Sequence, residues 1–236
     1  MQKLNPGWEN RLLQRLGADD FSHLQPNLNQ FSMVVGAVLH APGSSIDYVY
    51  FPVSGMVSLL VVMRTGEQIE TAIVGREGVI GASIGSDGSQ SAGQATVQIA
   101  GSAWRIAAPK FLEMYQTRVS FRTLVNKFQN VILLQTQQSA ACHALHTVEA
   151  RLCRWLLQSQ HVTGSDIVPL TQEFLSHMLG VRRNSVSLCA HALQKAGLIQ
   201  YSRGQIKILN RDGLQDSACE CYEVIREHID NAVPPL

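Results

Sequence analysis

The pattern of apolar residues changes once along the chain, close to Pro109. Between residues 33 and 106 they occur in short runs, rich in Val, Ile and Tyr, that are broken by Gly and Pro. After Pro109 their spacing becomes helical, and residues 121–145 contain neither Pro nor Gly. Short strands at regular spacing favour a sandwich or barrel-like roll over alternating βαβ units. The chain is therefore predicted to be an α+β protein in which a β domain precedes a helical part.

Six runs between residues 33 and 107 have the composition of strands: MVVGAVLH, IDYVYFPVSG, MVSLLVVM, EQIETAIVG, ATVQIA and AWRIA. Before them, residues 8–30 are predicted to form short helical pieces, with Trp8, Leu12, Leu13 and Leu16 at helical spacing. The stretch GASIGSDGSQSAG, residues 81–93, is a Gly/Ser-rich loop that is long enough to border a ligand; the alternative is that it is simply flexible. We expect the strands to close into a roll with this loop between two of them.

The balance of charge differs between segments. The whole chain of 236 residues has a net charge of +1, with 45% hydrophobic and 16% charged residues, as expected for an ordered globular protein. Residues 148–211 hold 8 Lys and Arg against 3 Asp and Glu, a net charge of +5. The segment after residue 211 is acidic, with 1 against 6. A basic module of this kind permits a polyanionic partner.

Neither a signal peptide nor an apolar run long enough to cross a membrane is evident, so we expect a cytoplasmic protein without membrane contact. The five cysteines are odd in number and show no CxxC, which gives no reason to expect a disulfide framework or a metal site. We interpret them as reduced thiols. No GxSxG, HExxH or phosphate-cradling loop occurs, so the sequence does not suggest an enzyme.

The Pro- and Gly-free segment is predicted to be a single long helix. A stripe with alternating three- and four-residue steps runs along it: Phe121, Leu124, Phe128, Val131, Gln135, Gln138, Cys142 and Leu145. Such a stripe suits pairing with the same helix of a second copy. The alternative is that the stripe packs on the sheet of its own chain, and the central glutamines favour it. A second helix, TVEARLCRWLLQSQHV, follows and ends near Gly164.

Residues 170–208 show the signals of a helix, a short turn and a second helix. Thr171 is a candidate cap, Gly180 ends the first helix, and Gly197 suits the end of the second. The stretch LIQYSRGQIKIL then predicts two strands with Arg203 and Gly204 at their tip. This succession is typical of a winged helix-turn-helix.

Arg182 and Arg183 stand where a capping residue is usual, although the positive end of the helix dipole disfavours cations. The apolar residues of the second helix leave Arg183, Asn184, Ser187 and His191 on the opposite side. Such side chains pair with base edges and phosphates. The predicted DNA-contacting set is Thr171, Gln172, Arg182, Arg183, Asn184, Ser185, Ser187, His191 and Arg203. The alternative is an ordinary helical hairpin with a solvated charged face.

The segment LTQEFLSHMLGVRRNSVSLCAHALQKAGLI closely resembles the helix-turn-helix of Crp/Fnr transcription regulators, and YVYFPVSGMVSLL and EARLCRWLL resemble other parts of that family. The resemblance implies three domains: a cyclic-nucleotide-binding-like, jelly-roll-like double-stranded β-helix at residues 1–116, a dimerisation helix at 117–146, and a winged helix-turn-helix at 147–236. It further implies phosphate contacts for Gln172 and Arg182, and entry of Arg183, Asn184 and Ser187 into the major groove.

In the sensor half the chain departs from members that bind cyclic AMP. Their Gly-Glu pair is replaced by Gly81-Ala82, and the position of their Arg-Ser/Thr-Ala triplet falls near Gly93-Gln94-Ala95. Without these charged partners a cyclic phosphate would be costly to bury, so cyclic AMP is not the expected ligand. The predicted effector pocket comprises Arg76, Gly81, Ala82, Ser83, Gly93, Gln94 and Ala95. Arg76 or Arg105 is a candidate substitute charge.

The cofactor, if any, stays unknown. No amino-terminal cysteine cluster for iron–sulfur binding is present, and His40 by itself is a weak candidate for a haem ligand. The function predicted is that of a homodimeric regulator that recognises an inverted repeat in double-stranded DNA and works with RNA polymerase, under an unknown small-molecule effector. The alternative is a constitutive DNA-binding regulator whose β-roll holds no ligand.

Overall fold

The structure is a computed structural model that describes residues 9–86, 89–170, 172–202 and 204–235. The chain divides into two units, which are described separately. The first contains the residues up to 59, residues 73–133 and those from 228 on, and the second contains residues 60–72 and 134–227.

Short helices open the described part, as predicted. These elements are η1 (Leu13–Arg15), α1 (Ala18–Leu24) and η2 (Gln25–Asn27). Leu12, Leu13 and Leu16 are buried, while Trp8 lies outside the described residues. The side chain of Asn10 fixes this segment, because its amide donates to the carbonyls of Pro52 and Gly78 over 2.8 and 2.9 Å.

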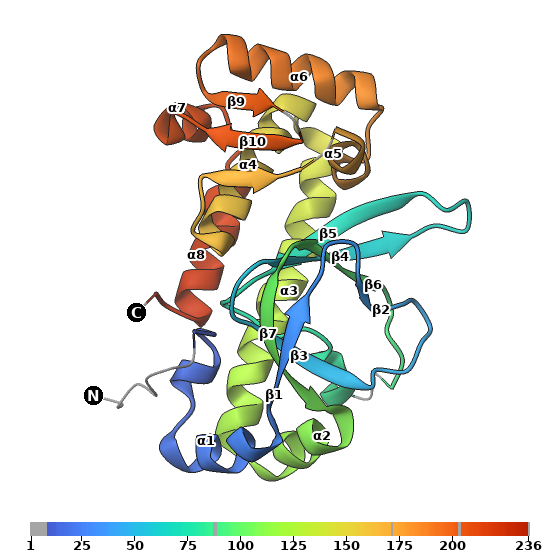
Figure 1. Cartoon of the computed structure of the whole chain (residues 1–236), viewed down its shortest axis with the longest axis vertical. Coiled ribbons are helices and arrows are strands. Elements are labelled where there is room, and N and C mark those ends of the chain that lie inside the picture. Colours follow the sequence, from blue (N-terminus) through green and yellow to red (C-terminus); the bar gives the residue numbers. More distant parts are fainter. Residues whose placement is uncertain (1–8, 87–88, 171, 203, 236) are drawn as a thin grey trace. The chain divides into compact units, whose positions relative to one another are not determined.

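Among the described residues of the amino-terminal half, seven strands form two sheets, which confirms the predicted β-roll (Figure 1). The strands are β1 (Asn29–Met33), β2 (Val38–His40), β3 (Tyr48–Pro52), β4 (Met56–Val62), β5 (Gln68–Val74), β6 (Gln94–Ile99) and β7 (Gly101–Ala107). One sheet has the order β1-β7-β3 and the other β2-β6-β4-β5. The run MVVGAVLH, expected to be one strand, is divided between β1 and β2 by a turn at Gly36, whose φ is 83°.

Helices η3 (Ala82–Ser86) and α2 (Ala108–Thr117) complete the roll. Strand β7, which precedes α2, pairs antiparallel with β3. Phe51 lies opposite Trp104 in this pair and is fully buried. From α2, Phe111 packs edge-on to Phe121 with 5.5 Å between the ring centroids. The core of the roll is therefore closed by helices on one side.

The long helix is α3 (Val119–Leu145), and most of the predicted stripe is buried within its own chain. Phe121, Phe128, Val131, Gln135 and Cys142 are all buried. A Cβ atom built on Gly78 would lie 2.0 Å from Cζ of Phe128, so that ring rests directly on the backbone after β5. Five of the eight stripe residues are thus covered by their own chain, as the alternative expected, whereas Leu124 and Gln138 are half-buried and Leu145 is 79% exposed. The role of this helix in pairing two copies stays a prediction. A periodic stripe identifies a buried face but does not say which molecule covers it.

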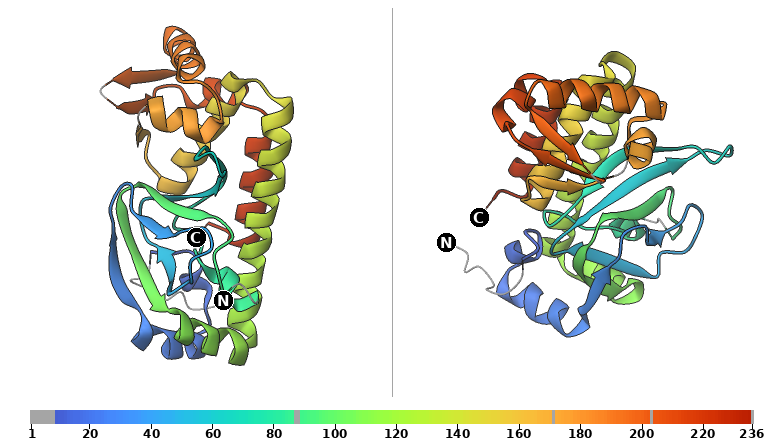
Figure 2. Two further views of the ribbon diagram at one scale, coloured as in Figure 1. Left: turned by 90° about the vertical axis from the view of Figure 1, so that its right-hand side faces the viewer. Right: turned by 45° about the horizontal axis from the view of Figure 1, so that its top comes forward.

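The second unit contains a small sheet and most of the remaining described helices, and α8 continues into the first unit after residue 227. The elements are α4 (Val148–Thr163), β8 (Ile167–Pro169), α5 (Gln172–Leu179), α6 (Arg183–Lys195), β9 (Ile199–Ser202), β10 (Gln205–Ile208), α7 (Arg211–Asp216) and α8 (Cys221–Ala232). The sheet has the antiparallel order β8-β10-β9, so the predicted wing has a third strand that the sequence pattern did not indicate. Figure 2 shows α6 lying along this sheet.

Candidate DNA-binding interface

Helices α5 and α6 pack together through their apolar faces. Leu175, Met178 and Leu179 are buried on α5, and Val186, Ala190 and Leu193 on α6. Gly180 forms the turn between them, with a left-handed φ of 59°. The N–H of Val181 donates to the Ser176 carbonyl over 3.0 Å, which closes the end of α5. The predicted helix-turn-helix is thus present, with its turn glycine in the conformation that glycine adopts most readily.

The start of α6 is as unusual as its sequence predicts. Arg182 occupies the N-cap, its side chain forms no capping hydrogen bond, and Arg183 is the first helical residue. Cations at this end of a helix are disfavoured by the dipole, typically by about 0.3–1 kcal/mol at an exposed site. The amides of a helix start are suited to binding phosphate. Two exposed arginines placed there favour an external anion.

The polar face of α6 is open to solvent. Arg182, Arg183, Asn184 and His191 are exposed, whereas Ser185 and Ser187 are half-buried. The hydroxyl of Ser187 donates to the Arg183 carbonyl over 3.1 Å, so it is already engaged within the helix. The structure brings these predicted residues together on one surface and leaves their role in binding DNA as a prediction.

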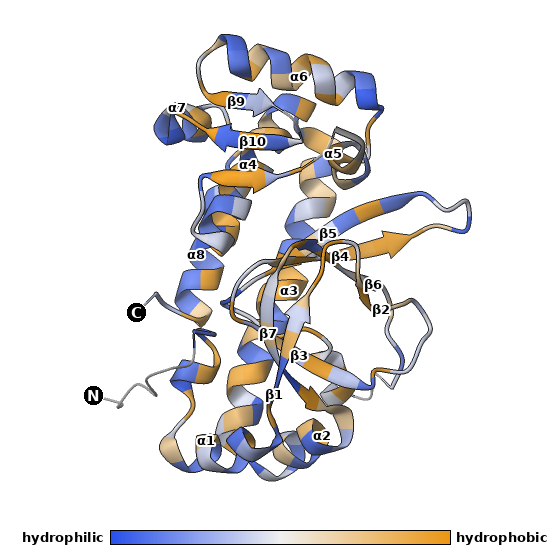
Figure 3. Cartoon of the chain, in the orientation of Figure 1, coloured by the Kyte–Doolittle hydropathy of each residue, from blue (hydrophilic) through white to orange (hydrophobic). Residues whose placement is uncertain are grey.

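One member of this surface was missed as a contact residue from the sequence. Leu188 lies between Ser187 and His191 on α6, and 73% of it is exposed. A large apolar side chain this exposed on a polar helix face suits contact with the methyl group of thymine. Its position in the helix, five residues after Arg183, was the available signal. Figure 3 shows hydrophilic and hydrophobic residues mixed along α6.

The wing lies beside α6. The side chain of Gln194 accepts a 2.8 Å hydrogen bond from the N–H of Tyr201, which joins the end of α6 to β9. Gln205 pairs with Ser202 across the tip, and Lys207 is exposed on β10. Thr171 and Arg203 lie outside the described residues, as does the side chain of Gln172.

Two buried groups hold α5 in place. The guanidinium of Arg151 on α4 donates to the Leu179 carbonyl at the end of α5, and burial lowers the pKa of Arg151. Trp155 donates from Nε1 to the Glu70 carboxylate on β5 over 2.7 Å. Its ring also packs edge-on to Phe174 of α5, with 6.2 Å between the centroids. The hairpin of residues 60–72 is therefore anchored to the core beneath the helix-turn-helix.

Two of the predicted effector residues, Gly81 and Ala95, lie next to His40. His40 pairs with Ala95, and a Cβ atom on Gly81 would lie 2.4 Å from Cε1 of His40. Ala82 is buried at the start of η3, and Ser83 is exposed. Two further members bond locally: the Gly93 carbonyl accepts from Ser91 at 2.7 Å, and the Gln94 amide donates to Thr96 at 2.9 Å. Arg76 is exposed in the turn after β5.

His40 and Arg105 are both engaged with neighbouring aromatic residues. The ring of His40 is buried and its Nε2 lies 2.9 Å from the Tyr48 carbonyl, while burial lowers its pKa. The guanidinium of Arg105 lies 4.5 Å above the Tyr48 ring and 5.0 Å from that of Phe31. This packing is that of a structural histidine and a cation–π contact.

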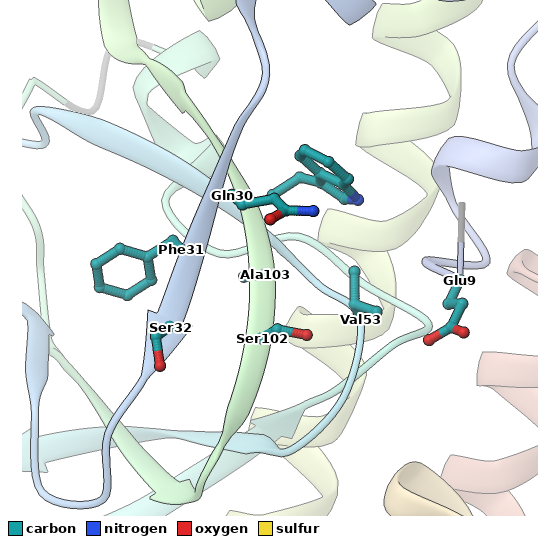
Figure 4. A pocket seen from close by; sticks show the side chains of 8 residues that line it. Glu9, Gln30, Phe31, Ser32, Val53, Ser102 and Ala103 are labelled. Atoms are coloured by element: carbon teal, nitrogen blue, oxygen red, sulfur yellow. The ribbon is translucent and has the colours of Figure 1, made fainter. Parts of the chain in front are cut away.

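A pocket of about 490 Å³ is lined by residues of β1 and β7, by Val53 directly after β3 and by Glu9 (Figure 4). Glu9, Gln30, Val53, Ser102 and Trp104 are among its lining residues, and the predicted effector residues lie elsewhere.

Each half of the chain contains a segment that matches a known protein family. Residues 32–118 match the cyclic nucleotide-binding domain, and residues 150–217 match the Crp-like helix-turn-helix domain. The chain belongs to the Crp/Fnr family of regulators. It is a DNA-binding transcription regulator rather than an enzyme, and its Crp-like helix-turn-helix is the DNA-binding element.

Solved structures show the same Crp/Fnr fold. A transcriptional regulator of this family from Eubacterium rectale is 17% identical, with a TM-score of 0.69 over 87% of this chain and 96% of that one. FixK2 from Bradyrhizobium japonicum is 17% identical, with a TM-score of 0.70 over 81% and 98%. The c-di-GMP-responsive global regulator CLP from Xanthomonas campestris is 16% identical, with a TM-score of 0.65 over 81% and 98%.

Among curated protein sequences, none is significantly similar to this Crp/Fnr chain. Within the part of the chain that the structure describes, no helix has the length and hydropathy needed to span a bilayer.

Proposed function

We propose that this regulator binds an inverted repeat in double-stranded DNA as a homodimer, and that its β-roll does not respond to cyclic AMP. The observation that supports DNA binding is the exposed face of α6. This helix begins with two exposed arginines, and no side chain caps it. Arg183 is suited to a bidentate contact with guanine, Asn184 to adenine and Leu188 to a thymine methyl group. Arg182 is suited to a phosphate, and so is Gln172 by likeness to the family.

Pairing of two copies is proposed along the solvent side of α3. Leu133 is 57% exposed near the middle of that helix, and Gln137, Ala140 and Ala144 continue its face toward the carboxyl end. Small residues let two helix backbones approach closely, and an apolar residue supplies area to bury. This face replaces the stripe that the sequence suggested. Two α6 helices related by a twofold axis then enter successive major grooves.

The first experiment tests the dimer on its operator. Sedimentation in the presence of DNA selected from a random pool should give two chains per duplex, and the selected sites should be inverted repeats spaced by about one helical turn. Leu133→Glu should produce monomers and weaken operator binding, because two like charges would face each other. Val38→Glu, at a site 50% exposed on β2, is the matched control and should stay dimeric. Selection of sites without twofold symmetry would overturn the proposal.

The proposal that the β-roll does not respond to cyclic AMP rests on the charges around the predicted effector pocket. The position that holds Glu in cyclic-AMP-binding members is the buried Ala82, and Gly93 and Gln94 offer no cation. Arg105 is held over two aromatic rings, and Arg76 is exposed. A phosphate in a half-buried site needs a charged partner to offset its desolvation. A ligand shifts the equilibrium between two states only through different affinities for them.

Calorimetric titration is expected to show no binding of cyclic AMP or cyclic GMP at physiological concentration, with no change in thermal stability or operator affinity. DNA binding should be measurable without added nucleotide. Micromolar binding that Arg105→Ala or Arg76→Ala abolishes would contradict this expectation, because it would show that a neighbouring arginine replaces the missing cation.

A further candidate is that the β-roll holds no ligand and DNA binding is constitutive. The tight contact between His40 and Gly81, which leaves no room for a Cβ atom, favours it. The c-di-GMP-responsive relative shows the same fold in a protein that responds to a different nucleotide, which supports an effector of another kind. Native mass spectrometry of the purified protein separates the two by the presence or absence of a retained small molecule. Cooperation with RNA polymerase is proposed in either case.

A further inference from the structure

Three cysteines and a histidine that are far apart in the sequence meet at one point in the second unit. Cys142 lies in the last turn of α3, and His146 follows one turn later, with its N–H donating to the Cys142 carbonyl over 3.1 Å. Cys219 and Cys221 come from the link between α7 and α8, where Cys221 is the first residue of α8. All three cysteines are buried, and His146 is half-buried. Cys142 and Cys219 are 77 positions apart in the sequence.

The distances among the four side chains match the ligand shell of one ion. The sulfur atoms of Cys142 and Cys219 are 3.5 Å apart, and Sγ of Cys221 lies 3.5 Å from Nδ1 of His146. All four ligand atoms lie within 4.8 Å of one another. With Zn–S bonds of about 2.3 Å and Zn–N bonds of about 2.0–2.1 Å, ligands of a tetrahedral zinc ion lie about 3.5–3.8 Å apart.

A second set of residues surrounds the cluster in the way that outer-shell groups support metal ligands. Nε2 of His146 lies 3.2 Å from the Glu220 carboxylate, which fixes the ring with Nδ1 toward the cysteines. A carboxylate on the far nitrogen is the usual partner of a metal-binding histidine. The amide of Gln138 donates to Sγ of Cys221 over 3.1 Å. These contacts orient two of the four ligands.

Two buried cations lie near the cluster. Three thiolates around a divalent cation carry a net negative charge of one, and the buried guanidinium groups of Arg151 and Arg154 interact electrostatically with Cys142. The surroundings therefore offset the charge of a loaded site.

We propose that Cys142, His146, Cys219 and Cys221 form a zinc site that joins the carboxyl end of α3 to the start of α8. Three sulfur ligands and one imidazole are a donor set that zinc prefers in structural sites. Because the protein supplies all four ligands, the ion has no open position for a substrate. Its role is structural, and the partly exposed His146 and Glu220 give the ion a path of entry.

The experiment uses the full chain, expressed with zinc and purified under a reductant without chelator. Metal analysis should find one zinc ion per chain. Exchange with Co²⁺ should give the intense visible bands of a tetrahedral ion and a thiolate-to-cobalt charge-transfer band, and a strong chelator should lower the thermal midpoint. No stoichiometric metal in reduced protein, or a pale spectrum typical of six oxygen and nitrogen ligands, would overturn the proposal. A Cys142–Cys219 disulfide in protein purified this way would overturn it as well.

Substitutions of the four proposed ligands test whether the ion binds at this cluster. Cys142→Ser and Cys219→Ser should lose stoichiometric zinc, whereas Cys189→Ser, at a half-buried thiol of α6 outside the cluster, should keep it. His146→Ala changes a half-buried residue and serves where the cysteine variants fail to fold. It should weaken metal binding at least about 10–100-fold and alter the cobalt spectrum. Equal loss in Cys189→Ser, or an unchanged spectrum in His146→Ala, would assign the ion to another place.

Discussion

Arg183→Ala is expected to weaken binding to the cognate operator by about 1–3 kcal/mol per half-site while affecting random DNA much less. The reason is that Arg183 stands exposed at the first position of α6, where a recognition helix meets base edges. Two half-sites double the effect in a symmetric dimer. Fluorescence anisotropy with the selected operator and with a scrambled duplex, over a range of salt concentrations, measures both affinities.

Arg182→Ala is the matched comparison, because the two arginines are adjacent and both exposed. Removal of a phosphate contact should weaken cognate and random DNA alike and should reduce the salt dependence by about one contact per subunit. The two variants are thus expected to differ in specificity rather than in affinity alone. Equal losses on both duplexes for Arg183→Ala would contradict its assignment to base recognition.

Trp155→Ala is expected to lower the free energy of unfolding by about 3–5 kcal/mol, as for other large buried aromatic residues. Trp155 is 1% exposed, packs against Phe174 of α5 and donates to Glu70 of the hairpin between β4 and β5. Its removal leaves a cavity beneath the helix-turn-helix. Operator affinity should therefore fall together with stability. Urea denaturation and DNA titration on the same samples measure the two effects.

Trp155→Phe separates the packing from the hydrogen bond. It keeps an aromatic ring but removes the indole N–H, so a smaller loss of about 1–3 kcal/mol is expected. Trp104→Phe is the control, because it makes the same substitution at a tryptophan of β7 that is partly exposed. It should change stability by at most about 0.5 kcal/mol, as is usual at surface sites. A loss in Trp104→Phe as large as that in Trp155→Phe would remove the role given to the Glu70 contact.

The local sequence determined most of the elements. Alternating apolar residues and turn glycines placed the strands of the roll, since a strand has a period of two whatever lies above it. Gly180 and Gly197 marked the ends of α5 and α6, and both have positive φ in the structure. The arginine at the cap position, residue 182, by itself points to an external anion. These features depend on neighbours a few residues away, which a sequence shows directly.

Only the tertiary structure decided what covers each face and which distant residues meet. The stripe from Phe121 to Cys142 faces its own chain, because burial depends on the elements packed against a helix and not on its period. The three-residue segment of β8 is too short to have a pattern of its own, and β10 fixes it by pairing. The meeting of Cys142 with Cys219 depends on how α3 and α8 pack, because no local spacing relates residues so far apart. Packing alone therefore brings these thiols to the one point where a zinc ion is proposed.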